Sequence, residues 1–277
     1  MTMRSSLSSS LRVGSLPAML LLLNIAEVQP VVGQAPCTPP EAMKARLQDK
    51  PDAAAYTDLG VWFADQKLYA CAANAFATSM QTQPDQKDMP HVAFMFGVSL
   101  YFSGDAKEAI TALQEAEQLG YNDVKLHTVL AAALDASQQN KDAEDEWRAA
   151  LAFDPESSVA LDALSNDLLR DNDFAGTIAL LQVPRLLGQR TAQQSLNLAA
   201  AYAGTARLDE AVRVLRDGLN TSPDSLALAD QLAKTLVKLN RKDEAVTVLE
   251  LALAKHPDAA GLKATLAEVQ NGASSGK

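Results

Sequence analysis

The chain has 277 residues, of which 48% are hydrophobic and only 5% aromatic, and its formal net charge is -10. An acidic balance of this kind disfavours nucleic acid and anionic membrane surfaces as partners, because binding to phosphate depends on clustered Lys and Arg. Ala and Leu dominate and strand signals are nearly absent, which predicts one elongated all-helical domain.

Residues 1–35 have the layout of a secretory signal peptide. Two arginines stand in a Ser-rich stretch without acidic residues, an apolar run follows from Leu16 to Ala26, and small residues suit cleavage after Gly33 or Ala35. A membrane anchor would need about 20 apolar residues, roughly twice the length of this run. An organelle transit peptide is the main alternative. We therefore expect an exported protein, periplasmic or secreted, with no membrane insertion after cleavage.

Residues 36–52 form an N-terminal segment before the repeats, and Pro39 to Leu47 is predicted to be a short helix that caps the first repeat. The chain has only two cysteines, Cys37 in this segment and Cys71 further along. In an oxidising compartment the two can form a disulfide that ties the segment to the first repeat. The alternative is two unrelated thiols, with Cys71 a small residue at a helix contact.

A 34-residue repeat organises residues 53–258. Six units start near Ala53, Pro90, Val124, Ser158, Ala192 and Leu226, with three extra residues before the second. The eighth and twentieth residues of a unit are small and the twenty-fourth is large, as in Gly60, Ala72 and Phe76. Apolar residues also recur at steps of four. This pattern predicts pairs of antiparallel helices, which cannot bury their apolar faces alone and must stack on their neighbours.

The first unit carries the clearest family signature. Its matching residues are Tyr56, Leu59, Gly60, Phe63, Ala72, Phe76 and Pro84. In this register the chain resembles the tetratricopeptide repeat family from about residue 53 to 257. The resemblance implies a right-handed superhelical solenoid of about six antiparallel helix pairs. Two units depart from the pattern: the second has Tyr121 where the family has Pro, and the fourth has Thr177 and Pro184, which predict a bent or loosened second helix.

The C-terminal end of such a stack needs a cap. Residues 259–270 place Leu262, Leu266 and Val269 on one face and polar residues opposite, which predicts a capping helix over the last pair. Residues 271–277 are short and polar, and we expect a disordered tail there.

The family resemblance implies a concave groove lined by the first helix of each unit. In the second unit the lining positions hold His91, Phe94, Val98, Tyr101 and Phe102, an aromatic cluster that is unusual for residues outside the core. Exposed aromatic residues often mark a binding surface. The alternative is that the N-terminal segment, or the insertion before the second unit, covers them.

Later units contribute polar groove positions. These are Asn166, Arg170, Asn197, Lys234 and Lys238. The Asn amides can hydrogen-bond an extended peptide, and the two lysines, one turn apart, can meet an acidic segment. The basic residues of the family's carboxylate clamp are missing, because Asp162, Ala227 and Gln231 occupy those places. An ordinary solvated face is the alternative for these positions.

No constellation for catalysis is recognisable in the sequence. His91, His127 and His256 lie in separate units without a second ligand at metal spacing, so we expect no metal site. There is no phosphate-binding glycine loop and no nucleophile elbow, and no cofactor is expected. The sequence predicts a non-catalytic, exported scaffold that binds a peptide segment or a partner protein in its groove. The alternatives are an accessory or regulatory subunit of an enzyme complex and a self-assembling structural element of the cell envelope.

Overall fold

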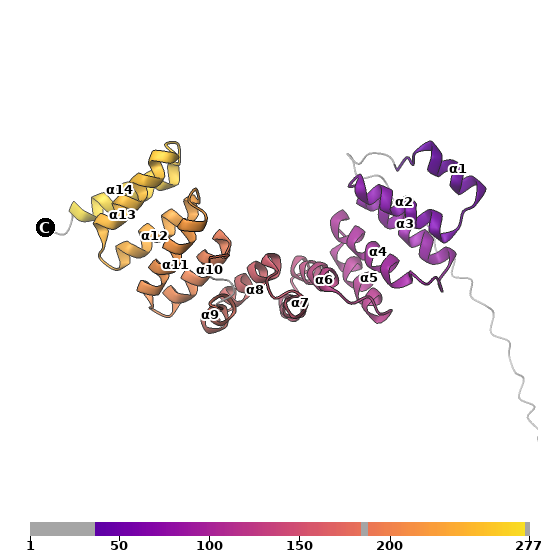
Figure 1. The fold of residues 1–277 in the computed structure, drawn as a ribbon, viewed down its shortest axis with the longest axis horizontal. Helices are drawn as coiled ribbons and strands as arrows, with labels where there is room; N and C mark the ends of the chain where they lie inside the picture. Colours follow the sequence, from indigo (N-terminus) through magenta and orange to yellow (C-terminus); the bar gives the residue numbers. More distant parts are fainter. Residues whose placement is uncertain (1–36, 184–187, 275–277) are drawn as a thin grey trace, which may run out of the picture. The chain divides into compact units, whose positions relative to one another are not determined.

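The computed structural model describes residues 37–183 and 188–274, with the side chains described up to residue 271. The predicted signal peptide at residues 1–35 lies outside the described residues. All regular structure in the described ranges is α-helical (Figure 1). The prediction of an all-α fold is therefore confirmed.

Six consecutive helix pairs follow a short first helix, α1 (Glu41–Asp49). They are α2 (Ala53–Asp65) with α3 (Tyr69–Thr82), α4 (Met89–Ser103) with α5 (Ala106–Gln118), α6 (Val124–Ala136) with α7 (Asn140–Phe153), α8 (Ser158–Arg170) with α9 (Phe174–Leu181), α10 (Ala192–Gly204) with α11 (Leu208–Thr221), and α12 (Leu226–Lys238) with α13 (Lys242–Lys255). Each second helix packs on the helix that follows it in the chain, and α10 packs on α8 as well as on α9. The last helix, α14 (Ala260–Ser274), covers α12 and α13.

Small and large side chains alternate in the core as the repeat predicts. The twentieth residue of every unit is fully buried, and so are the large residues at the twenty-fourth position, with Trp147 the most exposed of them at 3%. A Cβ atom added to Gly60 would lie 2.6 Å from the ring of Phe76, which shows how closely α2 approaches α3. This interdigitation gives the stack the density of a protein interior.

The turns between paired helices share one backbone feature. The fifteenth residue of each unit has a positive φ: Lys67, Gly104, Gln138, Asn172, Ala206 and Asn240. Its left-handed conformation ends the first helix and redirects the chain into the second within a few residues. Five of the six are not glycine, with φ between 59° and 61°.

Side-chain caps help to set where several helices begin. Asp52, Asp123, Asp173, Thr191 and Ser225 each accept a hydrogen bond from a backbone amide in the first turn of α2, α6, α9, α10 or α12. Such caps satisfy amides that have no partner inside the helix. Four of the five helices capped in this way are the first of their pair.

A disulfide joins Cys37 to Cys71, whose Cα atoms are 5.5 Å apart, and so ties the N-terminal segment to α3. Helix α1 begins two residues later than the predicted helix start and packs Met43 and Leu47 against the core of the first pair. Arg46 of α1 forms an ion pair with Asp58 of α2. Covalent, apolar and ionic contacts thus all fix this segment on the first repeat.

Helix α9 is the main departure from the repeat. It spans 8 residues, whereas the other second helices span 13 or 14. The sequence predicted a bent or loosened helix here; instead the helix ends at Leu181, three residues before Pro184 in the sequence. A proline disfavours helical backbone in the residue before it, which accounts for an early end.

The C-terminal helix also differs from the expectation. Helix α14 runs to Ser274, so residues 271–274 are helical rather than part of a disordered tail. The predicted apolar face is present, because Leu262 and Val269 are buried and Leu266 is half-buried against the last pair. Once that face is anchored, backbone hydrogen bonds can carry the helix past its last apolar contact.

Candidate functional site

The aromatic residues of the second repeat do not form one exposed patch. Phe94 is only 6% exposed, because Tyr121 from the loop before α6 stacks on it with ring centroids 4.4 Å apart. His91 is exposed and its ring lies 5.8 Å from that of Tyr121. The expectation of a free Phe94 side chain is therefore wrong: the residue that replaces the family's proline covers it.

Tyr121 also helps to start the next helix. Its hydroxyl donates a hydrogen bond of 3.0 Å to Asp123, the cap of α6. Burial, and then the hydrogen bond and charge of Asp123, raise the pKa of Tyr121 to about 12. The phenol therefore stays neutral and keeps donating at any physiological pH. The sequence shows Tyr121 where the family has Pro, but it does not indicate that this side chain covers Phe94 and contacts the cap of α6.

The remaining aromatic side chains gather at the far end of α4. Phe102 is 54% exposed and stacks on Tyr69 of α3, with centroids 5.0 Å apart. Tyr101 is half-buried and meets Phe102 edge-on, and Val98 is half-buried against the core. Of the five aromatic-cluster positions predicted from the sequence, only His91 and Phe102 are exposed in the structure.

Asn197 is an internal bridge rather than a free amide. It is 4% exposed, and its Nδ2 donates to Ser165 Oγ at 2.7 Å and to Asn166 Oδ1 at 2.9 Å, both on α8. Its Oδ1 accepts from Gln193 Nε2 at 2.8 Å. These contacts use the donor and acceptor atoms that a peptide would need, and they link α8 to α10. Asn166 itself is exposed.

Arg170 is an exposed cation on α8 that forms an ion pair with a neighbouring carboxylate. Its Nη2 lies 2.8 Å from Oδ1 of Asp167, a buried carboxylate whose Oδ2 has no hydrogen-bond partner among the described residues. Burial, and then the nearby charge of Asp135, raise the pKa of Asp167, whereas Arg170 acts in the opposite direction. Arg170 therefore serves first as the partner of a buried acid.

The two predicted lysines line a hollow between α12 and α14. The hollow has a volume of about 370 Å³ and is bounded by Gln231, Lys234, Val237, Lys238, Thr265, Glu268 and Val269. Lys234 forms an ion pair with Asp230 at 2.6 Å, and Asp230 also accepts a 2.6 Å hydrogen bond from Thr265 of α14. Lys238 is exposed and makes no ion pair with any residue that the structure describes. The hollow thus holds one neutralised and one available cation.

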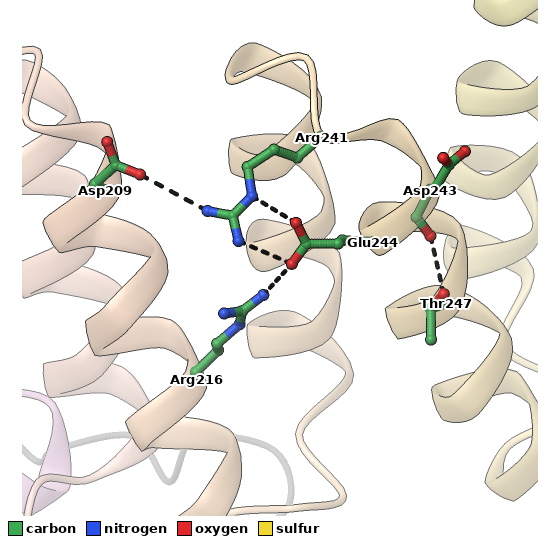
Figure 2. A network of polar contacts seen from close by, with 6 residues as sticks. All are labelled: Asp209, Arg216, Arg241, Asp243, Glu244 and Thr247. Carbon is green, nitrogen blue, oxygen red and sulfur yellow. Dashed lines mark hydrogen bonds and ion pairs between the residues drawn. The ribbon is translucent and has the colours of Figure 1, made fainter.

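A polar network joins the last two repeats, between α11 and α13 (Figure 2). Glu244 of α13 accepts hydrogen bonds from Arg241, at 2.6 and 2.8 Å, and from Arg216 of α11, at 2.5 Å. Arg241 reaches Asp209 of α11 at 3.7 Å. The hydrogen bonds from Arg241 and then Arg216 lower the pKa of Glu244 to about 2. Because these groups are exposed, their effect is screened by salt.

The described ranges, 37–183 and 188–274, contain neither a metal-binding cluster nor a membrane-spanning helix. No group of three or more His, Cys, Asp or Glu is placed to hold a metal ion. None of the helices there combines the length and apolar character that crossing a bilayer requires.

Known proteins resemble this chain in part of its sequence and in its fold. Residues 206–269 match the tetratricopeptide repeat family model, a stretch that covers α11 to most of α14 and contains the hollow. No curated protein matches the sequence.

Three solved structures share the architecture. A tetratricopeptide repeat protein from Parabacteroides merdae is 13% identical with a TM-score of 0.62, and covers 80% of this chain and 87% of its own. The C-terminal part of a repeat-containing protein from Cytophaga hutchinsonii is 14% identical with a TM-score of 0.64, covering 77% and 84%. MamA from Desulfovibrio magneticus is 15% identical with a TM-score of 0.54, covering 62% and 97%. The described part of the chain therefore has the all-α superhelical fold of tetratricopeptide repeat proteins, and residues 206–269 carry the sequence signature of that repeat.

Proposed function

We propose that this protein is a non-catalytic scaffold that binds an extended, acidic segment of a partner protein along its first helices. The observation that carries the proposal is the hollow between α12 and α14, where Lys238 is exposed without an ion pair among the described residues. A repeat stack is a rigid support for such a segment, because each pair is held by its neighbours on both sides. The tetratricopeptide repeat fold supports an interaction role of this kind.

The chemistry of the hollow favours a mixed acidic and apolar ligand. Lys238 and Lys234 supply positive charge, Gln231 and Thr265 supply hydrogen-bonding groups, and Val237 supplies apolar surface. An acidic side chain near Lys238 would gain a charge-assisted contact, while Asp230 already occupies Lys234. Glu268 on the rim disfavours a ligand with several adjacent carboxylates.

The proposal is tested by fluorescence anisotropy with labelled acidic peptides selected from a display library on the folded protein. Lys238→Gln should weaken binding about two- to fivefold, the effect of about 0.5–1 kcal/mol for an exposed charge pair. The matched control is Lys141→Gln on α7, where the lysine is also exposed. Equal affinities for both variants and the wild type would remove the hollow from the binding surface.

We also propose that the protein is exported. The signal-like pattern of residues 1–35 and the Cys37–Cys71 disulfide support an oxidising destination. Expression of the full chain followed by fractionation and mass spectrometry of the N-terminus tests this directly. Recovery of an uncleaved chain with two free thiols would contradict it.

A further inference from the structure

An apolar hollow opens where α11, α12 and α13 meet. Its volume is about 280 Å³, and its walls include Leu219 of α11, Ala229 of α12 and Val248 of α13. Leu226 and Leu251, which are 38% and 65% exposed, also line it, so the hollow is open to solvent. It shares no lining residue with the hollow between α12 and α14, and all of its lining residues belong to the described ranges.

The third repeat shows what can fill this place. In the sixth repeat, positions 4, 23 and 30 hold Ala229, Val248 and Lys255, which all line the hollow. In the third repeat the same positions hold His127, Glu146 and Phe153. The His127 ring is buried, with its centroid 5.4 Å from that of Phe153 and its Nδ1 2.7 Å from Oε2 of Glu146. An aromatic ring therefore occupies in the third repeat the place that Ala229 is too small to fill in the sixth.

The small side chain at position 4 accounts for the hollow. The first, third and fourth repeats carry a large residue there, namely Tyr56, His127 and Leu161. The side chain of Ala229 ends at Cβ, while the fully buried Leu249 keeps α13 packed at its usual distance. Well-packed helices relax only partly around a volume that no side chain fills.

The polar surroundings of the two places differ in one respect. The His127 ring faces two oxygen atoms, because its Nε2 also lies 2.8 Å from Oδ1 of Asn122. In the sixth repeat Val248 replaces Glu146, whereas Asp224 takes the place of Asn122, two residues before the unit begins, and lines the hollow. One oxygen partner is therefore kept and the other is replaced by apolar surface. A ring with a single N–H group matches this arrangement.

Indole is the side-chain ring that has these properties. Tryptophan carries one donor, Nε1–H, and no acceptor on an otherwise apolar double ring. An apolar cavity of about 150 Å³ holds benzene. A volume of about 280 Å³ therefore leaves room for the larger indole.

The charged groups at the rim suit the same ring. Oδ1 of Asp224 lies 3.3 Å from Nζ of Lys255, and the Asp224 side chain is 72% exposed, so its carboxylate can accept a further hydrogen bond. Lys255 stands at the place of Phe153, where its ammonium group can contact the face of a bound ring.

We propose that this hollow binds a tryptophan side chain from an extended segment of a partner protein, with its indole N–H donated to Asp224. Tryptophan often dominates the energy of protein interfaces because it combines a large apolar area with a donor. Its binding would also cover the exposed Leu226 and Leu251. The inference does not rest on the proposed binding of an acidic segment, because the two hollows have separate linings.

Titration of the folded, ¹⁵N-labelled chain, followed in ¹H–¹⁵N correlation spectra, tests the inference. The probe is acetylated and amidated Gly-Trp-Gly, the matched peptide without an N–H on its ring is Gly-Phe-Gly, and free indole is the small-molecule reference. We expect saturable shifts at Ala229, Val248 and Ala252, with an affinity about threefold lower for the Phe peptide. No saturable shift with the Trp peptide, equal affinities of the two peptides, or binding of indole alone would overturn the inference.

Two variants test the wall and the acceptor of the hollow. Ala229→Tyr restores a large residue at position 4, so it should abolish binding without lowering the melting temperature. Asp224→Ala should weaken the Trp peptide about threefold and leave the Phe peptide unchanged. Binding that survives Ala229→Tyr, or an equal effect of Asp224→Ala on both peptides, would contradict the proposal.

A rim variant keeps the test decisive if Ala229→Tyr does not fold. Leu251→Ser removes apolar surface at a position that is 65% exposed, so it should leave the fold intact and weaken the Trp peptide about threefold. Leu119→Ser is the matched control, because Leu119 is also exposed and does not line this hollow. Equal affinities of the two serine variants would overturn the inference.

Discussion

Asn197→Ala should destabilise the fold rather than remove a ligand contact. The substitution deletes the amide that joins α10 to Ser165 and Asn166 of α8 and that accepts from Gln193. A hydrogen bond contributes about 1 kcal/mol net, and those to exposed partners contribute nearer 0.5 kcal/mol. One bond to a buried partner and two to exposed partners therefore give about 2 kcal/mol. The Ser165 hydroxyl still donates to the Asp162 carbonyl at 3.1 Å, so no buried donor loses its only partner.

Urea unfolding followed by far-UV circular dichroism measures this loss. A change of about 2 kcal/mol corresponds to a melting temperature lowered by about 4–8 °C in a protein of this size. Amide hydrogen exchange should accelerate first in α8 and α10, because the bridge joins only those helices. Asn220→Ala is the matched control: Asn220 is exposed on α11, and its substitution should change stability by less than about 0.5 kcal/mol.

The opposite result would refute the reasoning. If Asn197→Ala unfolds like the wild type and still loses partner binding, the amide is a ligand contact, as its sequence position suggested. A double-mutant cycle with Ser165→Ala gives a second check, with an expected coupling of about 1 kcal/mol between the two residues. A coupling near zero would show that the 2.7 Å contact does not stabilise the native state.

Three further predictions concern the packing, the disulfide and the buried acid. Gly97→Ala should destabilise the protein by about 1 kcal/mol in urea unfolding, although Ala is the better helix former, because the added Cβ would lie 2.7 Å from the Leu113 side chain. Gly261→Ala is the control and should be neutral or stabilising, because no atom lies within 4 Å of its added Cβ. Cys37→Ser should lower the free energy of unfolding by at most about 4 kcal/mol, the loop-closure estimate for this disulfide. In limited proteolysis α1 should be cleaved before the other helices, and simultaneous digestion of all helices would contradict this. Because the pKa of Asp167 is raised in the native state, the wild type loses stability as the pH rises from the unfolded-state pKa through the native-state pKa. The melting temperature of Asp167→Asn minus that of the wild type should therefore be larger at pH 7 than at pH 4, and an equal difference at both pH values would contradict the assignment.

Much of the fold could be predicted from the repeat because each pair depends on local spacing. Small residues at the eighth and twentieth positions and large ones at the twenty-fourth determine which faces meet, and the residues at these positions are buried in all six pairs. Pro184 indicated that the second helix of the fourth unit would depart from the repeat, because proline disfavours helical backbone in the residue directly before it.

The candidate site was predicted less well than the fold for a related reason. Position within a repeat indicates which side of a helix a residue occupies, but not what a neighbouring unit places over it. Phe94 is covered by Tyr121, which lies 27 positions further along the chain, and Asn197 is saturated by partners 31 and 32 positions earlier. Lys234 and Lys238 remained on an open hollow because the helix opposite them, α14, presents Thr265 and Glu268 there.

The left-handed residues in the six turns offer a way to strengthen this protein. Lys67, Gln138 and Ala206 carry a Cβ atom in a backbone conformation that costs about 1–2 kcal/mol for an ordinary side chain, whereas Gly104 occupies the equivalent place without that cost. Glycine at those three turns would remove this conformational cost and so stabilise the fold, although the greater freedom of glycine in the unfolded chain would offset part of the gain. None of the three lines the hollow between α12 and α14. A glycine-substituted background could therefore keep weakened variants folded while their ligand affinities are compared.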